Sequence, residues 1–145
     1  MHLIVDGFGA DQEKLQDLDF LYGLLDQYPS RIGMTKIMPP YVFRYVGAKP
    51  EDWGLSGVVL IAESHISIHT FPDHAYINID IFSCKAFDAD AAIDFMQQGF
   101  GLSRVETKVL ERGLEYPHEM EPAVELVRTE RLEVAAAQVS AGSGV

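Results

Sequence analysis

The sequence predicts an α+β fold, in which a mostly antiparallel sheet carries about two helices packed on one face. Two observations lead to this fold class. Several segments alternate apolar and polar residues with the two-residue period of a half-buried strand. Two longer segments instead carry apolar residues at the spacing of a helix.

The N-terminal part of the chain contains a strand and a helix. Residues 2–5 form a short apolar run that predicts a strand. Residues 11–28 predict a helix, because leucines recur at helical spacing and Asp11 can cap its start. Pro29 is expected to end this helix.

An extended region follows the helix. Residues 35–45 look extended but are interrupted by two adjacent prolines, and residues 47–53 form a polar loop. Residues 56–62 are nearly continuously apolar, as expected for a strand that is covered on both faces.

The two segments that come next alternate most clearly. In residues 63–69 the polar side chains occupy odd positions, and in residues 76–84 the isoleucines share one face. Residues 88–100 predict a helix with Asp88 at its N-cap. Residues 105–110 alternate again and predict the last strand.

The end of the chain differs in composition from the rest. It is rich in Glu, Ala and Val and closes with Ser-Ala-Gly-Ser-Gly-Val. We therefore expect a single domain over residues 1–120, followed by an acidic, Ala-rich tail over residues 121–145 that is partly disordered.

Composition limits the classes of function. The net charge of −11 argues against nucleic-acid binding, which needs clustered Lys and Arg, and mildly favours a small cationic substrate. No apolar run approaches the length of a membrane span, and the first residues lack the features of a signal peptide. We therefore expect a cytoplasmic protein that does not bind membranes. Cys84 is the only cysteine, which excludes an intrachain disulfide.

One segment is unusually polar for a strand. Its odd positions fall on one face directly after an apolar strand, and they are Glu63, His65, Ser67 and His69. The following strand places Asp80 and Cys84 on its own polar face. A cluster of titratable groups is costly unless its members are paired, and such clusters are often functional.

Metal binding and hydrolysis are two interpretations of this cluster. His65 and His69 are suitable metal ligands, but residues four apart in a strand are separated by more than about 10 Å, so no metal is expected unless the strand bends. A hydrolase is also not expected. No G-x-S-x-G elbow surrounds Ser64, and no papain-like context surrounds Cys84.

Two motifs in the same region are much more specific. They are GLSGVVLIAESHISIHTFP over residues 54–72 and IDIFSC over residues 79–84. The first closely resembles the hallmark stretch of prokaryotic S-adenosylmethionine decarboxylases. The second resembles the Asp-rich strand of that family, which ends in a catalytic cysteine. The spacings between serines, histidine and cysteine match the family pattern, and the resemblance covers roughly residues 1–113.

The resemblance implies a proenzyme that processes itself. Ser64 would attack the carbonyl of Glu63, and β-elimination would split the chain into residues 1–63 and 64–145. The cofactor would be a pyruvoyl group derived from Ser64, which acts as an electron sink for decarboxylation much as pyridoxal phosphate does.

The resemblance also implies roles for three other residues. His69 would be the base for elimination, and Ser56 would help to stabilise the oxyoxazolidine intermediate. Cys84 would return a proton to the product carbon during turnover.

The substrate-binding part of the motif departs from the family pattern. The family usually has a Trp that stacks on adenine where this chain has Phe71, and a Glu that binds the ribose hydroxyls where this chain has Asp73. Phe43 or Trp53 is a candidate for the second stacking ring. S-adenosylmethionine is the expected substrate, for spermidine synthesis. Ornithine or arginine remains the alternative, because homologues on this scaffold have changed substrate.

A homodimer is also expected. A sheet with helices on one side leaves its other face in need of cover. The resemblance implies a symmetric dimer of processed protomers, with the active sites near the interface.

Overall fold

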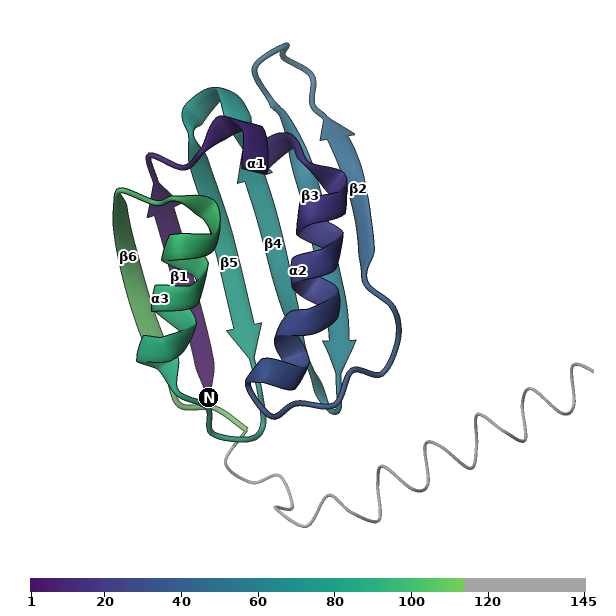
Figure 1. Cartoon of the computed structure of the whole chain (residues 1–145), viewed down its shortest axis with the longest axis vertical. Coiled ribbons are helices and arrows are strands. Elements are labelled where there is room, and N and C mark those ends of the chain that lie inside the picture. Colours follow the sequence, from purple (N-terminus) through teal and green to yellow (C-terminus); the bar gives the residue numbers. More distant parts are fainter. Residues whose placement is uncertain (114–145) are drawn as a thin grey trace, which may run out of the picture. The chain divides into compact units, whose positions relative to one another are not determined.

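The computed structural model describes residues 1–113 of the chain (Figure 1). Its elements in chain order are β1 (His2–Phe8), α1 (Gln12–Gln16), α2 (Leu18–Arg31), β2 (Tyr41–Val46), β3 (Trp53–Ile61), β4 (Ser64–Phe71), the 3₁₀ turn η1 (Pro72–His74), β5 (Tyr76–Phe82), α3 (Ala89–Phe100) and β6 (Arg104–Leu110). The expected tail over residues 121–145 lies outside the described residues. No helix within residues 1–113 is long and apolar enough to cross a membrane.

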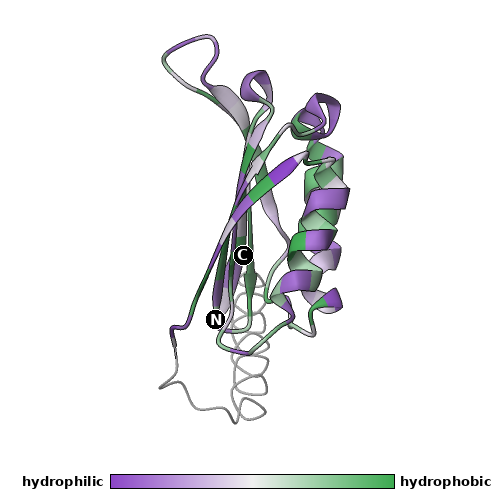
Figure 2. Cartoon of the chain, turned by 90° about the vertical axis from the view of Figure 1, so that its left-hand side faces the viewer, coloured by the Kyte–Doolittle hydropathy of each residue, from purple (hydrophilic) through white to green (hydrophobic). Residues whose placement is uncertain are grey.

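The six strands form one sheet in the order β2-β3-β4-β5-β1-β6, and each neighbouring pair is antiparallel. The helices lie on one face of this sheet, as the side view in Figure 2 shows. The predicted fold class is therefore confirmed.

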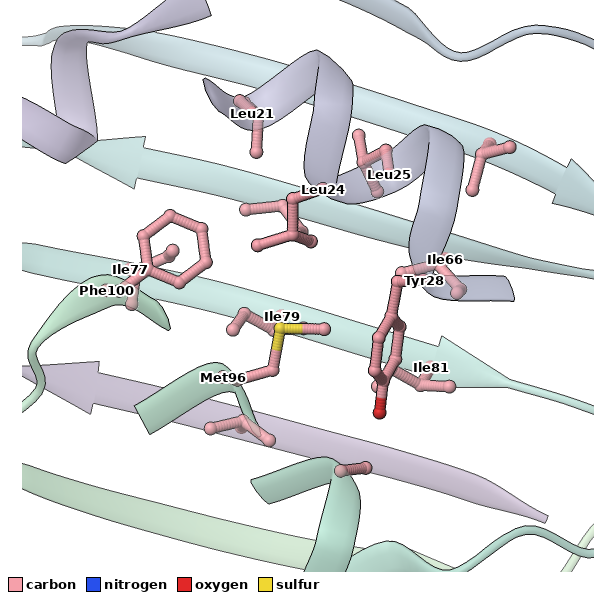
Figure 3. Packing of buried hydrophobic residues seen from close by; sticks show 14 of the residues in the cluster. Leu21, Leu24, Leu25, Tyr28, Ile66, Ile77, Ile79, Ile81, Met96 and Phe100 are labelled. Atoms are coloured by element: carbon pink, nitrogen blue, oxygen red, sulfur yellow. The ribbon is translucent and has the colours of Figure 1, made fainter. Parts of the chain in front are cut away.

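The core fills the space between the helices and the sheet (Figure 3). Alternate residues of β4 and β5 supply its floor, and the covering side chains come from α2 and α3. Fully buried members from both layers include Leu21, Leu25, Ile66, Ile68, Ile77, Ile79, Ile81, Met96 and Phe100. Each such side chain stabilises the fold by about 1.5–3 kcal/mol through removal from water.

The helix expected over residues 11–28 is divided into α1 and α2. The break occurs at Asp17, whose side chain accepts a hydrogen bond from the backbone N–H of Phe20 (2.9 Å) and so caps a second helix. Pro29 does not end α2, which continues to Arg31. A proline this close to the C-terminus removes one helical hydrogen bond, and Pro29 is buried, so its packing offsets that loss.

The later elements follow the sequence pattern closely. Asp88 caps α3 by accepting a hydrogen bond from Ala91 N (3.0 Å), as expected. The strands β5 and β6 lie where the alternation predicted them, with bounds that differ by at most two residues.

A two-residue turn at Ala62 and Glu63 joins β3 to β4. It sets Ile61 opposite Ser64, and the same register then sets Ser56 opposite His69. Register is fixed in this way because side chains alternate between the two faces of a strand. The turn therefore decides which polar residues meet.

The second face of the sheet has no helix over it in the described part of the chain; we call it the open face (Figure 2). One row of paired residues crosses all six strands on this face: Phe43, Ser56, His69, Asn78, Asp6 and Glu106. The open face thus carries polar and aromatic side chains where the opposite face carries the core.

Candidate active site

The turn between β3 and β4 is strained at Glu63. Its φ of 64° lies in the left-handed region, which costs a residue with a side chain about 1–2 kcal/mol. The next peptide bond joins Glu63 to Ser64, the bond that the sequence motif marks for cleavage. Strain is thus located beside that bond.

Polar groups surround the same peptide bond. The Cys84 thiol donates a hydrogen bond to the carbonyl oxygen of Glu63, with a sulfur–oxygen distance of 3.3 Å. The Ser64 hydroxyl and one carboxylate oxygen of Glu63 are buried and have no hydrogen-bond partner among the described residues. A buried hydroxyl without a partner is unusual and marks a group that is available for chemistry.

Ser56 and His69 form a second polar pair, on the open face. Ser56 Oγ lies 2.9 Å from His69 Nδ1 across the β3–β4 ladder. If Nδ1 carries the proton, Nδ1 donates the hydrogen bond and Ser56 Oγ accepts it. Nε2 then keeps a free lone pair, as a general base requires. Phe43 is paired with Ser56 on β2, so the predicted stacking ring lies in the same row.

These two groups of residues are separate within one chain. Ser64 begins β4, and His69 follows five positions later, which corresponds to about 16 Å along a strand. The two residues also belong to opposite faces, because Ile66 and Ile68 share the parity of Ser64 and point into the core. One protomer therefore does not bring His69 to Ser64.

The expected substrate-binding residues lie at the His69 end of the sheet. Phe71 packs against Tyr76 with 5.5 Å between ring centroids, and Asp73 is exposed in the turn η1. Trp53 lies under the guanidinium of Arg44 (4.4 Å to the ring centroid). Since Arg44 alternates with Phe43 along β2, Trp53 is on the face away from His69.

A hydrogen-bonded network supports Tyr76. Its hydroxyl donates to Asp6 Oδ1 (2.7 Å), and the amide of Asn78 donates to the same oxygen (2.5 Å). Burial, followed by the bond to Asp6, raises the pKa of Tyr76. The ring behind Phe71 is thus held in place.

The remaining titratable residues of the polar segment have other contacts. Asp80 pairs with His2, whose Nε2 lies 2.9 Å from Asp80 Oδ1. The ring of His65 packs on the edge of Phe82 at 5.8 Å. Within residues 1–113, no three His, Cys, Asp or Glu side chains lie close enough to share an ion.

Comparison with known proteins decides the family. A family model described as S-adenosylmethionine decarboxylase matches residues 1–113. The chain is 34% identical over 113 residues to an S-adenosylmethionine decarboxylase proenzyme of Clostridium botulinum, covering 77% of this chain and 92% of that protein. The chain belongs to the S-adenosylmethionine decarboxylase family. A proenzyme of Geobacillus kaustophilus is 35% identical over 113 residues, covering 78% of this chain and 86% of that protein.

A solved member of the S-adenosylmethionine decarboxylase family has the same fold. The crystal structure of the adenosylmethionine decarboxylase of Aquifex aeolicus superposes with a TM-score of 0.65 at 29% sequence identity. The match covers 81% of this chain and 93% of that one.

Some residues that shape the site were not singled out by sequence reasoning. Asp6 and Asn78 hold Tyr76 from β1 and β5, outside the hallmark stretch over residues 54–72. Thr70 belongs to the motif shared with S-adenosylmethionine decarboxylases, but its neighbours in space were not evident. The sequence offered one signal for Thr70: it is a polar residue at a position of β4 whose side chain faces the core.

Proposed function

We propose that this chain is a proenzyme that cuts itself between Glu63 and Ser64 and then decarboxylates S-adenosylmethionine with a pyruvoyl group made from Ser64. The observation that carries the proposal is the arrangement around the Glu63 carbonyl. A strained turn and a thiol donor at 3.3 Å adjoin it, and the next residue carries a serine hydroxyl that has no partner within residues 1–113.

The cleavage needs no external reagent except water. The Ser64 oxygen attacks the Glu63 carbonyl carbon, the C–N bond breaks, and the peptide bond becomes an ester with a free Ser64 amine. A base then removes the Cα proton of Ser64. The main-chain carboxylate of Glu63, which becomes the new C-terminus, leaves with the Cβ–O electron pair. Water hydrolyses the resulting enamine, by way of its imine tautomer, to the pyruvoyl ketone and releases ammonia.

Cys84 fits the first of these steps. As negative charge develops on the Glu63 oxygen, a donor already in place stabilises it without reorganisation. The proton that the thiol donates in this bond would then be available for return to the product carbon.

His69 fits the elimination step only if it comes from a second copy of the chain. Within one chain it is about 16 Å away along β4 and on the other face. A two-fold symmetric dimer through the open face would bring the His69 end of one sheet toward the Ser64 end of the other. Each active site is then built from two protomers.

The open face has the composition of such an interface. It carries exposed apolar side chains at Tyr41 (62% exposed), Phe43, Leu60 and Leu110, around the polar row. Aromatic residues with a polar surround are typical of protein–protein interfaces. We therefore propose a homodimer of processed protomers.

The substrate assignment rests on the aromatic residues beside His69. Phe71, held by Tyr76, and Phe43, in the row of Ser56, offer two rings for an adenine base. Asp73 is exposed and can accept bonds from ribose hydroxyls. When formed, the pyruvoyl group supplies the electron sink for loss of the carboxylate.

Denaturing mass spectrometry of the purified protein tests the cleavage. Wild type should give two chains, residues 1–63 and residues 64–145 with a blocked N-terminus, whereas Ser64→Ala should stay intact. A stable intact wild-type chain of 16.1 kDa would remove the mechanism.

Complementation tests whether the site is shared. Neither Ser64→Ala nor His69→Ala should cleave alone. When the two are co-expressed, the His69→Ala chain should be cut, because its Ser64 meets an intact His69 on the other protomer. If the mixture stays uncut while mixed dimers form, His69 does not act across the interface.

A further inference from the structure

Thr70 lies beside the Ser56–His69 pair, and no step proposed above uses it. The residue is 2% exposed, and its hydroxyl makes two good hydrogen bonds. It accepts from the backbone N–H of Leu55 (2.8 Å) and donates to the backbone carbonyl of Leu15 (2.8 Å). The hydroxyl thus donates its one hydrogen to α1 and accepts a hydrogen bond from β3.

The regular pairing of β3 with β4 ends next to this hydroxyl. Ser56 and His69 are the last paired residues at this end of the ladder. Leu55, one position further along β3, gives its N–H to the Thr70 side chain. A Cβ at Gly54 would come within 1.8 Å of the Thr70 carbonyl oxygen, so the two backbones approach closely only because residue 54 is glycine.

The bond to Leu15 connects this point to a helix. The last carbonyls of a helix have no partner within the helix, and α1 is short and ends at Gln16. Thr70 satisfies one of these carbonyls. The Thr70 hydroxyl therefore connects the end of α1 to β3 and β4. Its contact on β3, Leu55, precedes Ser56, and Thr70 itself follows His69 on β4.

We propose that Thr70 is a positioning residue for His69. Its hydroxyl holds β3 and β4 together beside Ser56 and His69. It thereby keeps Ser56 Oγ within hydrogen-bond distance of His69 Nδ1. The inference rests on the proposed function and concerns its elimination step. Ester formation at Ser64, at the other end of β4, is expected to proceed without the Thr70 hydroxyl, because Ser56 itself is unchanged.

Thr70→Val keeps the shape of the side chain and removes the hydroxyl, and Thr70→Ser keeps the hydroxyl. In a time course of self-cleavage, Thr70→Val should accumulate an ester that hydroxylamine cleaves and should finish at least tenfold more slowly than wild type. The pH midpoint of its elimination step should also shift, because His69 loses its fixed partner. Thr70→Ser should restore both the rate and the midpoint.

Ile77→Val is the matched control, since Ile77 is buried and pairs with Thr70 across β4 and β5. It should lower stability without trapping the ester or moving the midpoint. The inference is overturned if Thr70→Val matches wild type, or if it slows cleavage without trapped ester as Ile77→Val would. If Thr70→Val does not fold, a folded Thr70→Cys, with its weaker donor, must show partial trapping, or the inference fails. A wild-type chain that never cleaves would instead refute the proposed function.

Discussion

The thiol of Cys84 donates a hydrogen bond to the carbonyl oxygen of Glu63, two strands and a turn away along the chain. Cys84→Ala removes the donor that polarises this carbonyl. Self-cleavage should slow about tenfold, less than for a strong backbone donor because a thiol is a weak one. The fraction of cleaved chain over time on a denaturing gel measures the effect.

Cys84→Ser is the companion variant, because a hydroxyl can make the same bond. It should cleave faster than Cys84→Ala but still decarboxylate poorly. Cleavage of Cys84→Ala at the wild-type rate would leave the contact without a role in processing.

His69→Ala should stop processing after the ester has formed. The protein should then be intact by mass but should break at Glu63 when hydroxylamine is added. His65→Ala is the control, since His65 lies on the same strand and face but has no bond to Ser56. Normal processing of His69→Ala would show that another group removes the Cα proton.

The strain at Glu63 can be measured in a chain that does not cleave. With Ser64→Ala in both proteins, Glu63→Gly should raise the free energy of unfolding by about 1 kcal/mol, because glycine adopts a φ of 64° without steric cost. With Ser64 present, Glu63→Gly should cleave more slowly, since less strain is released. A lower melting temperature for Glu63→Gly would contradict this interpretation of the turn.

Phe71 and Asp73 separate the two substrate assignments. If the substrate is S-adenosylmethionine, Phe71→Ala should raise KM sharply by removing an adenine stacking ring, and Asp73→Asn should have a moderate effect. If it is ornithine or arginine, Asp73→Asn should be the crippling change. Release of labelled CO₂ from each candidate measures both. Release from ornithine or arginine alone would replace the substrate and leave the cleavage chemistry in place.

Ionisation of Tyr28 should lower the stability of the fold at alkaline pH. Burial, with the charge of Asp88 as a second cause, raises the pKa of Tyr28 to about 12 from its ordinary 10.0. The unfolded chain therefore loses this proton first, so the stability is fully present below pH 10 and falls as the pH rises toward 12. Tyr28→Phe should remove this part of the alkaline loss.

The same variant should also be slightly more stable at neutral pH. The Tyr28 hydroxyl is buried without a hydrogen-bond partner in the described part of the chain, and an unpaired buried group costs about 1–3 kcal/mol. Chemical denaturation at pH 7 and pH 11 distinguishes the two effects. An unchanged alkaline transition in Tyr28→Phe would assign it to other groups.

Much of the fold follows from local patterns in the sequence. The alternation of β4 and β5 and the cap at Asp88 are local signals, and each was predicted correctly. The division at Asp17 was missed because leucine spacing continues across it, while one side chain takes the role of a cap. Pro29 was placed wrongly because burial at the end of α2 outweighs the lost hydrogen bond.

The site could be predicted in part. Once the turn is placed at Ala62 and Glu63, the pairing of Ser56 with His69 follows from the register alone. The parity of β4 also separates Ser64 from His69, which the motif lists together. The contact of Cys84 with Glu63 could not be predicted, since it depends on how the chain turns after β5.

The strand order determines how the two polypeptides made by the proposed cut are held together. Cleavage after Glu63 would assign β1, β2 and β3 to one polypeptide and β4, β5 and β6 to the other. In the sheet, however, β1 of the first lies between β5 and β6 of the second. The two polypeptides are interleaved, so neither can leave without pulling a strand from the interior of the sheet. The mature protein would therefore keep its shape after cleavage, but once unfolded it could regain that shape only by a second-order encounter, at a rate that falls with dilution.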